Sequence, residues 1–147
     1  MEENTLKVTN LETSFQSDYG STRALENISF HIKQSEVLAL VGESGSGKTS
    51  LVLALLKLIS FKGDVIFNEK NISTISNNKL HNLRKDMQII FQDPFGSLSP
   101  RMTVKQIILE GLNIHEKKLS TEEKNYKVKK IIQEVGMNYE DTNERFP

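Results

Sequence analysis

Hydrophobic and polar residues alternate in two stretches near the start of the chain. Leu6 and Val8 alternate with polar neighbours, and so do Ile28, Phe30 and Ile32. A period of two places apolar side chains on one face of a strand and polar side chains on the other. These stretches therefore predict antiparallel strands with one face toward solvent.

A continuous apolar run, Val37 to Val41, follows the second alternating stretch. Such a run is typical of a central strand that is covered on both faces. The segment from Lys48 to Ile59 is apolar on nearly every side, which predicts a helix packed between other elements. Gly63 to Phe67 and Met87 to Phe91 are further strand candidates, and residues 80–83 suggest a short helix between them.

Two later helices are indicated by the residues at their first turns. Thr103 followed by Gln106 fits a capping box, in which hydroxyl and amide oxygens accept hydrogen bonds from backbone N–H groups of the first turn. Ser120 followed by Glu123 fits the same pattern, and Gly136 is a plausible end for the second helix. The chain thus reads as a small antiparallel β layer, then an α/β layer, then helices.

Composition limits the classes of function. The 147 residues suffice for one domain with a modest core. Nineteen basic and nineteen acidic side chains cancel, so no overall field favours nucleic acid. The absence of cysteine excludes disulfides and thiolate metal sites. The longest apolar run, Leu51 to Leu56, is far too short for a transmembrane segment.

Residues 42–49 contain a motif that binds phosphate groups. They read Gly-Glu-Ser-Gly-Ser-Gly-Lys-Thr and match the phosphate-loop motif G-x-x-x-x-G-K-[ST] at every fixed position. Glycines let the backbone wrap a triphosphate with inward N–H donors, Lys48 reaches the β- and γ-phosphates, and the Thr49 hydroxyl ligates magnesium. The alternative is a glycine-rich turn between a strand and a helix. That alternative explains Gly42 and Gly47 but not Lys48 and Thr49 at the required offset.

The segment Met87 to Val104 narrows the class of nucleotide-binding protein. It reads Met-Gln-Ile-Ile-Phe-Gln-Asp-Pro-Phe-Gly-Ser-Leu-Ser-Pro-Arg-Met-Thr-Val. This closely resembles the Q-loop region of ATP-binding cassette (ABC) transporter ATPases, in particular the branch that imports peptides and nickel. The Gly-Leu-x-x-His stretch at Gly111 to His115 is similar to that branch as well. The narrowest resemblance is to the second cassette of a tandem ATPase of the microcin-C-uptake type, over residues 6–147.

The resemblance implies roles for residues outside the phosphate loop. Gln92 would be the Q-loop glutamine, which contacts magnesium and the attacking water, so Lys48 and Gln92 are the expected catalytic residues. Phe15 would stack on adenine, with Tyr19 as the second candidate and a core position for Phe15 as the alternative. Thr49 and Gln92 are the expected magnesium ligands. The expected ATP-binding residues are Phe15, Gly42, Glu43, Ser44, Gly45, Ser46, Gly47, Lys48, Thr49 and Ser50.

Asp93 allows a second interpretation of the same region. It follows an apolar stretch, as the magnesium-binding aspartate does in other phosphate-loop enzymes. The preceding Gln92 and the following Pro94 favour the Q-loop interpretation.

The resemblance also bears on completeness and setting. In the family, Arg145-Phe146-Pro147 comes just before the Ser-Gly-Gly-Gln signature. We therefore expect residues 1–147 to be the N-terminal part of one ABC domain, an incomplete α/β phosphate-loop fold. The signature, the aspartate and glutamate after a second apolar strand, and the switch histidine would be absent, so we expect no ATPase activity from the chain alone.

Partners and location follow from the same resemblance. The implied cofactors are ATP and Mg²⁺. The implied partners are a second ABC domain and membrane permease subunits, which would contact the region after Gln92. The implied location is the cytoplasmic face of the cell membrane, where the chain would act as a peripheral ATPase subunit of an importer for peptides. A non-hydrolytic nucleotide-binding module and an inactive remnant remain the alternatives.

Overall fold

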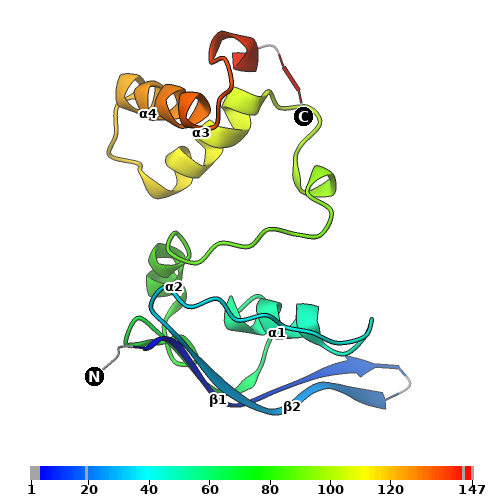
Figure 1. The fold of residues 1–147 in the computed structure, drawn as a ribbon. Coiled ribbons are helices and arrows are strands. Elements are labelled where there is room, and N and C mark those ends of the chain that lie inside the picture. The colour runs from blue at the N-terminus through cyan, green and yellow to red at the C-terminus, as the bar shows by residue number, and fades with distance from the viewer. Residues whose placement is uncertain (1–3, 19, 144, 147) are drawn as a thin grey trace. The chain divides into compact units, whose positions relative to one another are not determined.

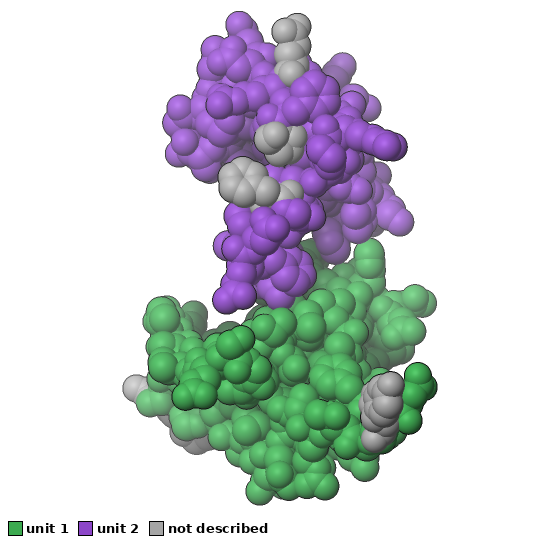
Figure 2. Space-filling view, turned by 90° about the vertical axis from the view of Figure 1, so that its right-hand side faces the viewer, with its two compact units in different colours: residues 1–87 green, residues 88–147 purple. Residues whose placement is uncertain are grey.

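The computed structural model describes residues 4–18, 20–143 and 145–146. The chain divides into two compact units, residues 1–87 and residues 88–147, which Figure 2 colours separately. Unit 1 contains the β-sheet and the phosphate loop. Unit 2 contains the two longest helices after that loop, together with two short 3₁₀ turns.

Unit 1 is built on a four-stranded sheet, with helices on one of its faces (Figure 1). Its elements are β1 (Asn4–Ser17), β2 (Gly20–Lys33), α1 (Lys48–Leu55), β3 (Lys62–Phe67), β4 (Lys70–Asn71) and α2 (Asn77–Leu83). The strand order is β2-β1-β3-β4, and each neighbouring pair is antiparallel. The predicted antiparallel β layer is therefore confirmed, as are the strand at 63–67 and the short helix near residues 80–83.

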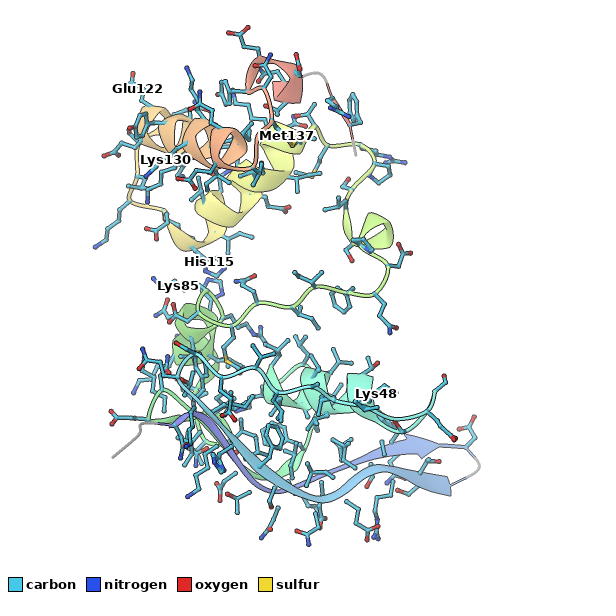
Figure 3. All side chains as sticks on the ribbon, in the orientation of Figure 1. Lys48, Lys85, His115, Glu122, Lys130 and Met137 are labelled. Carbon is cyan, nitrogen blue, oxygen red and sulfur yellow. The ribbon has the colours of Figure 1, made fainter. Side chains whose placement is uncertain are left out.

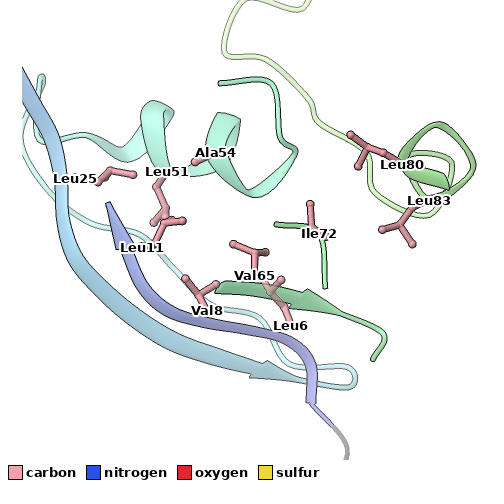
Figure 4. Close-up of a cluster of buried hydrophobic side chains, with 10 residues drawn as sticks. All are labelled: Leu6, Val8, Leu11, Leu25, Leu51, Ala54, Val65, Ile72, Leu80 and Leu83. Atoms are coloured by element: carbon pink, nitrogen blue, oxygen red, sulfur yellow. The ribbon is translucent and has the colours of Figure 1, made fainter. Parts of the chain in front are cut away.

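The core of unit 1 lies between the sheet and its helices. Alternation along β1 buries Leu6 and Val8 on one face, and a register shift between Val8 and Leu11 brings Leu11 to the same face; all three oppose partly buried apolar residues of β2. Each large aliphatic side chain buried in this way contributes roughly 1.5–3 kcal/mol. Figure 4 shows the whole buried cluster, which comprises Leu6, Val8, Leu11, Leu25, Leu51, Ala54, Val65, Ile72, Leu80 and Leu83.

The helix α1 ends at Leu55, so the prediction of a helix over residues 48–59 was too long. Lys57 has a left-handed backbone conformation, with φ of 51°. The N–H groups of Lys57 and Leu58 each donate to a carbonyl of the last turn at 2.9 Å, which closes a Schellman motif. Glycine usually occupies this position, and a lysine gives no such stop signal in the sequence.

The side chain of Lys57 connects the end of α1 to the segment after β4. Its ammonium group donates to the carbonyl oxygens of Ile72, Ser73 and Ile75 at 3.0, 3.1 and 3.1 Å. An ammonium group has three donors, so these contacts use all of them. The segment 72–75 is consequently fixed to the helix that begins at the phosphate loop.

Two strand predictions were wrong. Residues 37–41 and 87–91 both lack strand structure in the part of the chain that the structure describes. Val37 and Val41 are each 94% exposed, and Ile90 is 91% exposed. An apolar run indicates a buried strand only when other elements pair with it and cover it. The sheet of unit 1 provides neither pairing nor cover for residues 37–41.

Unit 2 is a small helical unit. It contains η1 (Phe95–Ser97), α3 (Val104–His115), α4 (Thr121–Glu134) and η2 (Glu140–Asn143). Val128, Ile132 and Thr142 are its fully buried side chains, and α4 and η2 supply them. Lys124 on α4 donates to the side-chain oxygen of Asn113 on α3 at 2.9 Å, so a polar contact also joins the two helices.

Both predicted capping boxes are confirmed. The Gln106 N–H donates to the Thr103 hydroxyl at 3.3 Å, and the Thr103 N–H donates to the Gln106 amide oxygen at 2.8 Å. At α4 the Glu123 N–H donates to the Ser120 hydroxyl at 3.2 Å, and the Ser120 N–H donates to the Glu123 carboxylate at 2.7 Å. Gly136, with φ of 76°, lies just beyond the end of α4 as predicted.

Candidate nucleotide-binding site

The phosphate loop approaches α1 through two glycines with positive φ. Gly45 and Gly47 have φ of 83° and 90°, a region that side chains with a Cβ rarely adopt. Within the loop, the N–H of Ser46 donates to the carbonyl of Glu43 at 3.2 Å and closes a tight turn. Helix α1 begins directly afterwards, and its first backbone bond runs from Leu51 to Gly47 at 2.8 Å.

The N-terminal end of α1 carries no groups that would compete with an anion. The residue before the helix, Gly47, has no side chain to cap the first N–H groups, and the first turn contains no acidic residue. The first N–H groups of a helix lack intrahelical partners and carry a partial positive charge. Together with the loop glycines, this arrangement is the one expected for phosphate binding.

The Lys48 side chain folds into the loop that precedes it. Its ammonium group donates to the carbonyl oxygens of Gly42 and Glu43 at 2.8 and 2.7 Å and to the Ser46 hydroxyl at 3.2 Å. Figure 3 shows Lys48 at the start of α1. Two backbone carbonyls and one side-chain hydroxyl of the loop therefore hold the positively charged Lys48 ammonium.

Close packing against the backbone accounts for Gly47, whereas the space beside Gly42 is limited only by a side chain that can rotate. A Cβ on Gly47 would lie 2.6 Å from the carbonyl oxygen of Ala24 and 3.1 Å from the Leu25 side chain, both on β2. A Cβ on Gly42 would lie 2.7 Å from the Ser46 hydroxyl oxygen. The contact with Ala24 was not predicted, because nothing in the sequence near Ala24 marks its carbonyl as a neighbour of the loop.

Thr49 and Ser50 lie in the first turn of α1, directly after Lys48. Thr49 is exposed and Ser50 is half-buried. No cluster of three or more histidine, aspartate or glutamate side chains that could hold a metal occurs in residues 4–18, 20–143 and 145–146. A magnesium ion held by one hydroxyl, water and substrate phosphates needs no such cluster, so the Thr49 side chain fits that type of site.

Phe15 lies near the far end of the β1–β2 hairpin, opposite Thr22, and is 45% exposed. Thr22 is two residues from Ala24, whose carbonyl lies against Gly47. The hairpin that carries Phe15 is thus packed on the phosphate loop, and the ring is not buried in the core. The second candidate, Tyr19, lies outside the described residues.

Gln92 belongs to unit 2, whereas the phosphate loop belongs to unit 1. It is exposed and lies in a segment without helix or strand, ahead of η1. Its neighbour Asp93 has a local structural role. The Asp93 carboxylate accepts a hydrogen bond from the Gly96 N–H at 3.2 Å, and its backbone carbonyl accepts one from the Ser97 hydroxyl at 3.2 Å. The aspartate therefore caps η1.

Comparison with known protein families decides the class of this nucleotide site. Residues 25–146 match the family model described as ABC transporter. The chain belongs to the ABC transporter family. The match covers the phosphate loop, the Gln92 region and all of the helices α1 to α4.

Three similar relatives are named as ATP-binding proteins of peptide transport. The chain is 40% identical to the oligopeptide transport ATP-binding protein OppF of Bacillus subtilis, over 100% of this chain and 48% of the relative. It is 41% identical to OppF of Streptococcus mutans, over 97% of this chain and 46% of the relative. It is 46% identical to a putative peptide import ATP-binding protein of Brucella ovis, over 74% and 35%. The chain thus spans at most about half the length of these relatives.

Solved structures confirm the fold class. The dimeric, post-hydrolysis structure of the ATP-binding cassette MJ0796, with ADP and Pi, matches with a TM-score of 0.79 and 21% identity, over 97% of this chain and 61% of that one. The cbiO1 protein of Clostridium perfringens, part of the transporter complex cbiONQ, matches with a TM-score of 0.72 and 27% identity, over 97% and 53%. In the described part of this ABC chain, every helix is too short or too polar to cross a membrane.

Proposed function

We propose that this chain is the ATP-binding component of an ABC importer for peptides or related solutes. The observation that carries the proposal is the preformed phosphate loop, in which the Lys48 ammonium is held by the carbonyls of Gly42 and Glu43. The names of the relatives in Bacillus, Streptococcus and Brucella support the peptide substrate class.

The proposed roles follow from where each group lies. Backbone N–H groups of residues 42–50 would bind the phosphates, and Lys48 would exchange its loop partners for β- and γ-phosphate oxygens. Thr49 would supply a hydroxyl to Mg²⁺, and Phe15 would offer a ring face to adenine. Gln92 would contact the metal and the attacking water, a role that rests on the resemblance of its segment. Mg²⁺ bound with ATP would neutralise phosphate charge during phosphoryl transfer.

The proposed setting is a membrane complex. A permease would contact the region after Gln92, and a second ABC domain would complete the nucleotide site. The chain would then lie at the cytoplasmic face of the membrane. We further propose that residues 1–147 correspond to the N-terminal part of one cassette, in a tandem ATPase of the microcin-C-uptake type. The match over residues 87–104 supports the peptide branch.

Calorimetry with ATP and magnesium tests the binding proposal. The chain should bind ATP more tightly with Mg²⁺ than without it. Lys48→Ala should weaken binding at least about tenfold, because it removes a charge-assisted contact worth about 1.5–3 kcal/mol. Lys130→Ala is the matched control, since this exposed lysine of α4 forms an ion pair with Glu134 at 3.8 Å and lies outside the phosphate loop. Equal affinities for the chain and Lys48→Ala would overturn the proposal.

ATP hydrolysis needs more than ATP binding. We propose that residues 1–147 by themselves bind ATP without hydrolysing it at a useful rate, because ground-state binding alone does not accelerate chemistry. Loss of a positioned general base typically removes about 10²–10⁴-fold in rate. Phosphate release under single-turnover conditions measures this, with Lys48→Ala reporting contaminating ATPases. A rate well above that control would contradict the proposal.

A further inference from the structure

A cavity of about 810 Å³ lies in unit 1, away from the residues of the phosphate loop. Its walls come from β4, from the segment that follows it, from α2 and from the residues directly after α2. Its volume falls in the range of sites that hold small ligands or short peptide segments. None of its lining residues belongs to the nucleotide site described above.

The cavity carries an excess of positive charge. Lys70, Lys79 and Lys85 line it, and Asp86 is the single carboxylate among its lining residues. The three lysines come from β4, α2 and the segment after α2, so they do not form a stripe along one helix face. Figure 3 labels Lys85 at the end of α2. Within the described residues, no carboxylate forms an ion pair with Lys70 or Lys79.

Two apolar residues, Ile75 and Leu83, line the cavity beside the polar Asn71, Thr74, Ser76 and Asn82. Ile75 is half-buried, whereas Leu83 is 3% exposed and belongs to the core cluster, so Ile75 is the apolar surface open to a ligand. Ammonium groups beside an exposed part of Ile75 match a ligand that carries both carboxylates and an aliphatic side chain. A bare inorganic anion would leave Ile75 in contact with water.

The walls are fixed before any ligand arrives. The Lys57 ammonium holds the carbonyl of Ile75 at 3.1 Å, and the Asn71 side chain accepts a hydrogen bond from the Ser73 N–H at 2.8 Å. The Ser73 hydroxyl in turn donates to the Gly63 carbonyl at 3.0 Å. A preformed site loses less conformational entropy on binding than a flexible one.

We propose that this cavity binds an acidic segment of a partner protein. One aliphatic side chain of the segment packs on Ile75, and carboxylates on either side of it face Lys70, Lys79 and Lys85. Exposed ion pairs are individually weak and are screened by salt, so the affinity depends on all three lysines and falls as ionic strength rises.

The probe for this proposal is a blocked pentapeptide of two glutamates, one leucine and two glutamates. It is titrated into the ¹⁵N-labelled 147-residue chain at low salt, and amide shifts are followed by NMR. We expect saturable shifts at residues 70–76 and 79–86. The double variant Lys70→Glu/Lys79→Glu should weaken binding by about tenfold or more, and Lys70→Gln/Lys79→Gln should have an intermediate effect.

Matched controls distinguish this site from general charge attraction. Lys117→Glu/Lys118→Glu changes the charge equally in the exposed loop between α3 and α4 and should leave the affinity unchanged. A peptide with glutamines in place of the glutamates should bind at least about tenfold more weakly. Lys48→Ala should bind the peptide normally, so failure of ATP binding and failure of this site are separate results.

Four outcomes would overturn the proposal: no saturable shifts, equal binding of the glutamine peptide, equal weakening by the control variant, or shifts confined to residues 42–50. Vesicles of phosphatidylcholine and phosphatidylserine test the competing class of partner. Binding to those vesicles that depends on Lys70 and Lys79, without binding of the peptide, would assign the cavity to a membrane surface instead.

Discussion

Gly47 lies against the carbonyl oxygen of Ala24 so closely that a Cβ on the glycine would come within 2.6 Å of that oxygen. This close approach places Gly47 of the phosphate loop against β2, which pairs with the strand that carries Phe15. The glycine is therefore needed for packing as well as for its positive φ. The sequence motif records only that a glycine stands there.

Gly45 and Gly47 separate these two requirements, packing and positive φ. Gly45→Ala adds a Cβ that meets nothing within 4 Å at φ of 83°, so it should cost only the left-handed strain of about 1–2 kcal/mol. Gly47→Ala adds the same strain at φ of 90° and also the clash with Ala24. Overpacking typically costs a further 1–3 kcal/mol or so. Urea unfolding of both variants measures the difference in free energy of unfolding.

Nucleotide affinity should follow the same order. Gly47→Ala is expected to weaken ATP binding more than Gly45→Ala, because only the former must move the loop from β2. Equal losses of stability and affinity in the two variants would show that the contact with Ala24 is without consequence.

Phe15 is expected to contribute to binding of the base. Phe15→Ala should weaken ATP binding by about 1–3 kcal/mol, while Phe15→Trp should retain most of the affinity, since either ring offers a face for stacking. ATP and GTP should differ little, because a ring face reads no hydrogen-bond pattern. Phe146→Ala is a control of similar exposure, 53% against 45% for Phe15. Unchanged affinity in folded Phe15→Ala would leave the ring without a role in binding.

Lys57 combines an unfavourable backbone conformation with a favourable side chain. Lys57→Ala should destabilise unit 1 by roughly 1–3 kcal/mol, because three partly buried carbonyls lose their donor. Lys57→Gly loses the same bonds but relieves the strain at φ of 51°, so it should be the more stable of the two by about 1 kcal/mol. Chemical denaturation of both variants tests this, and a glycine variant less stable than the alanine variant would contradict the account of strain.

The capping box of α4 should depend on pH, whereas that of α3 should not. Hydrogen bonds from the backbone N–H and the hydroxyl of Ser120 lower the pKa of Glu123 below its ordinary value of 4.5. A lowered pKa means that the carboxylate stabilises the fold fully above pH 4.5 and loses that effect as pH falls through the lowered value. The Gln106 amide in the other box does not titrate in this range.

An NMR titration of the side-chain carboxyl of Glu123 measures this directly. Its midpoint should lie below 4.5, and amide exchange at the start of α4 should accelerate as the carboxylate is protonated. Glu123→Gln should keep the box and abolish the pH dependence. An ordinary midpoint for Glu123 would show that the box does not persist in solution.

Local signals in the sequence predicted local structure well. Both capping boxes and the stop at Gly136 depend on residues within a few positions of one another, and the structure confirms them. The phosphate loop is an equally local signal, and the roles of its residues toward ATP and magnesium remain predictions. The alternation in β1 and β2 was equally informative, because each strand has the other as its neighbour along the chain.

Predictions that depended on distant partners were less successful. An apolar run such as residues 37–41 predicts a buried strand only if a neighbour is present, and periodicity along one segment carries no information about that neighbour. The early end of α1 coincides with the left-handed Lys57, whose side chain donates to carbonyls of Ile72, Ser73 and Ile75, and no pattern within residues 48–59 reveals those partners. The position of Gln92 relative to Lys48 is likewise a matter of tertiary arrangement, and it remains a prediction.

The Lys48 ammonium already has three partners inside its own loop. Binding of a triphosphate at Lys48, as proposed, would therefore be an exchange of ligands around one cation, in which carbonyl and hydroxyl oxygens give way to phosphate oxygens. The net affinity reports the difference between two coordination shells, and much of the gross attraction cancels. Side-chain rotamer changes take picoseconds to nanoseconds, so this exchange would lower the affinity without limiting the rate of association.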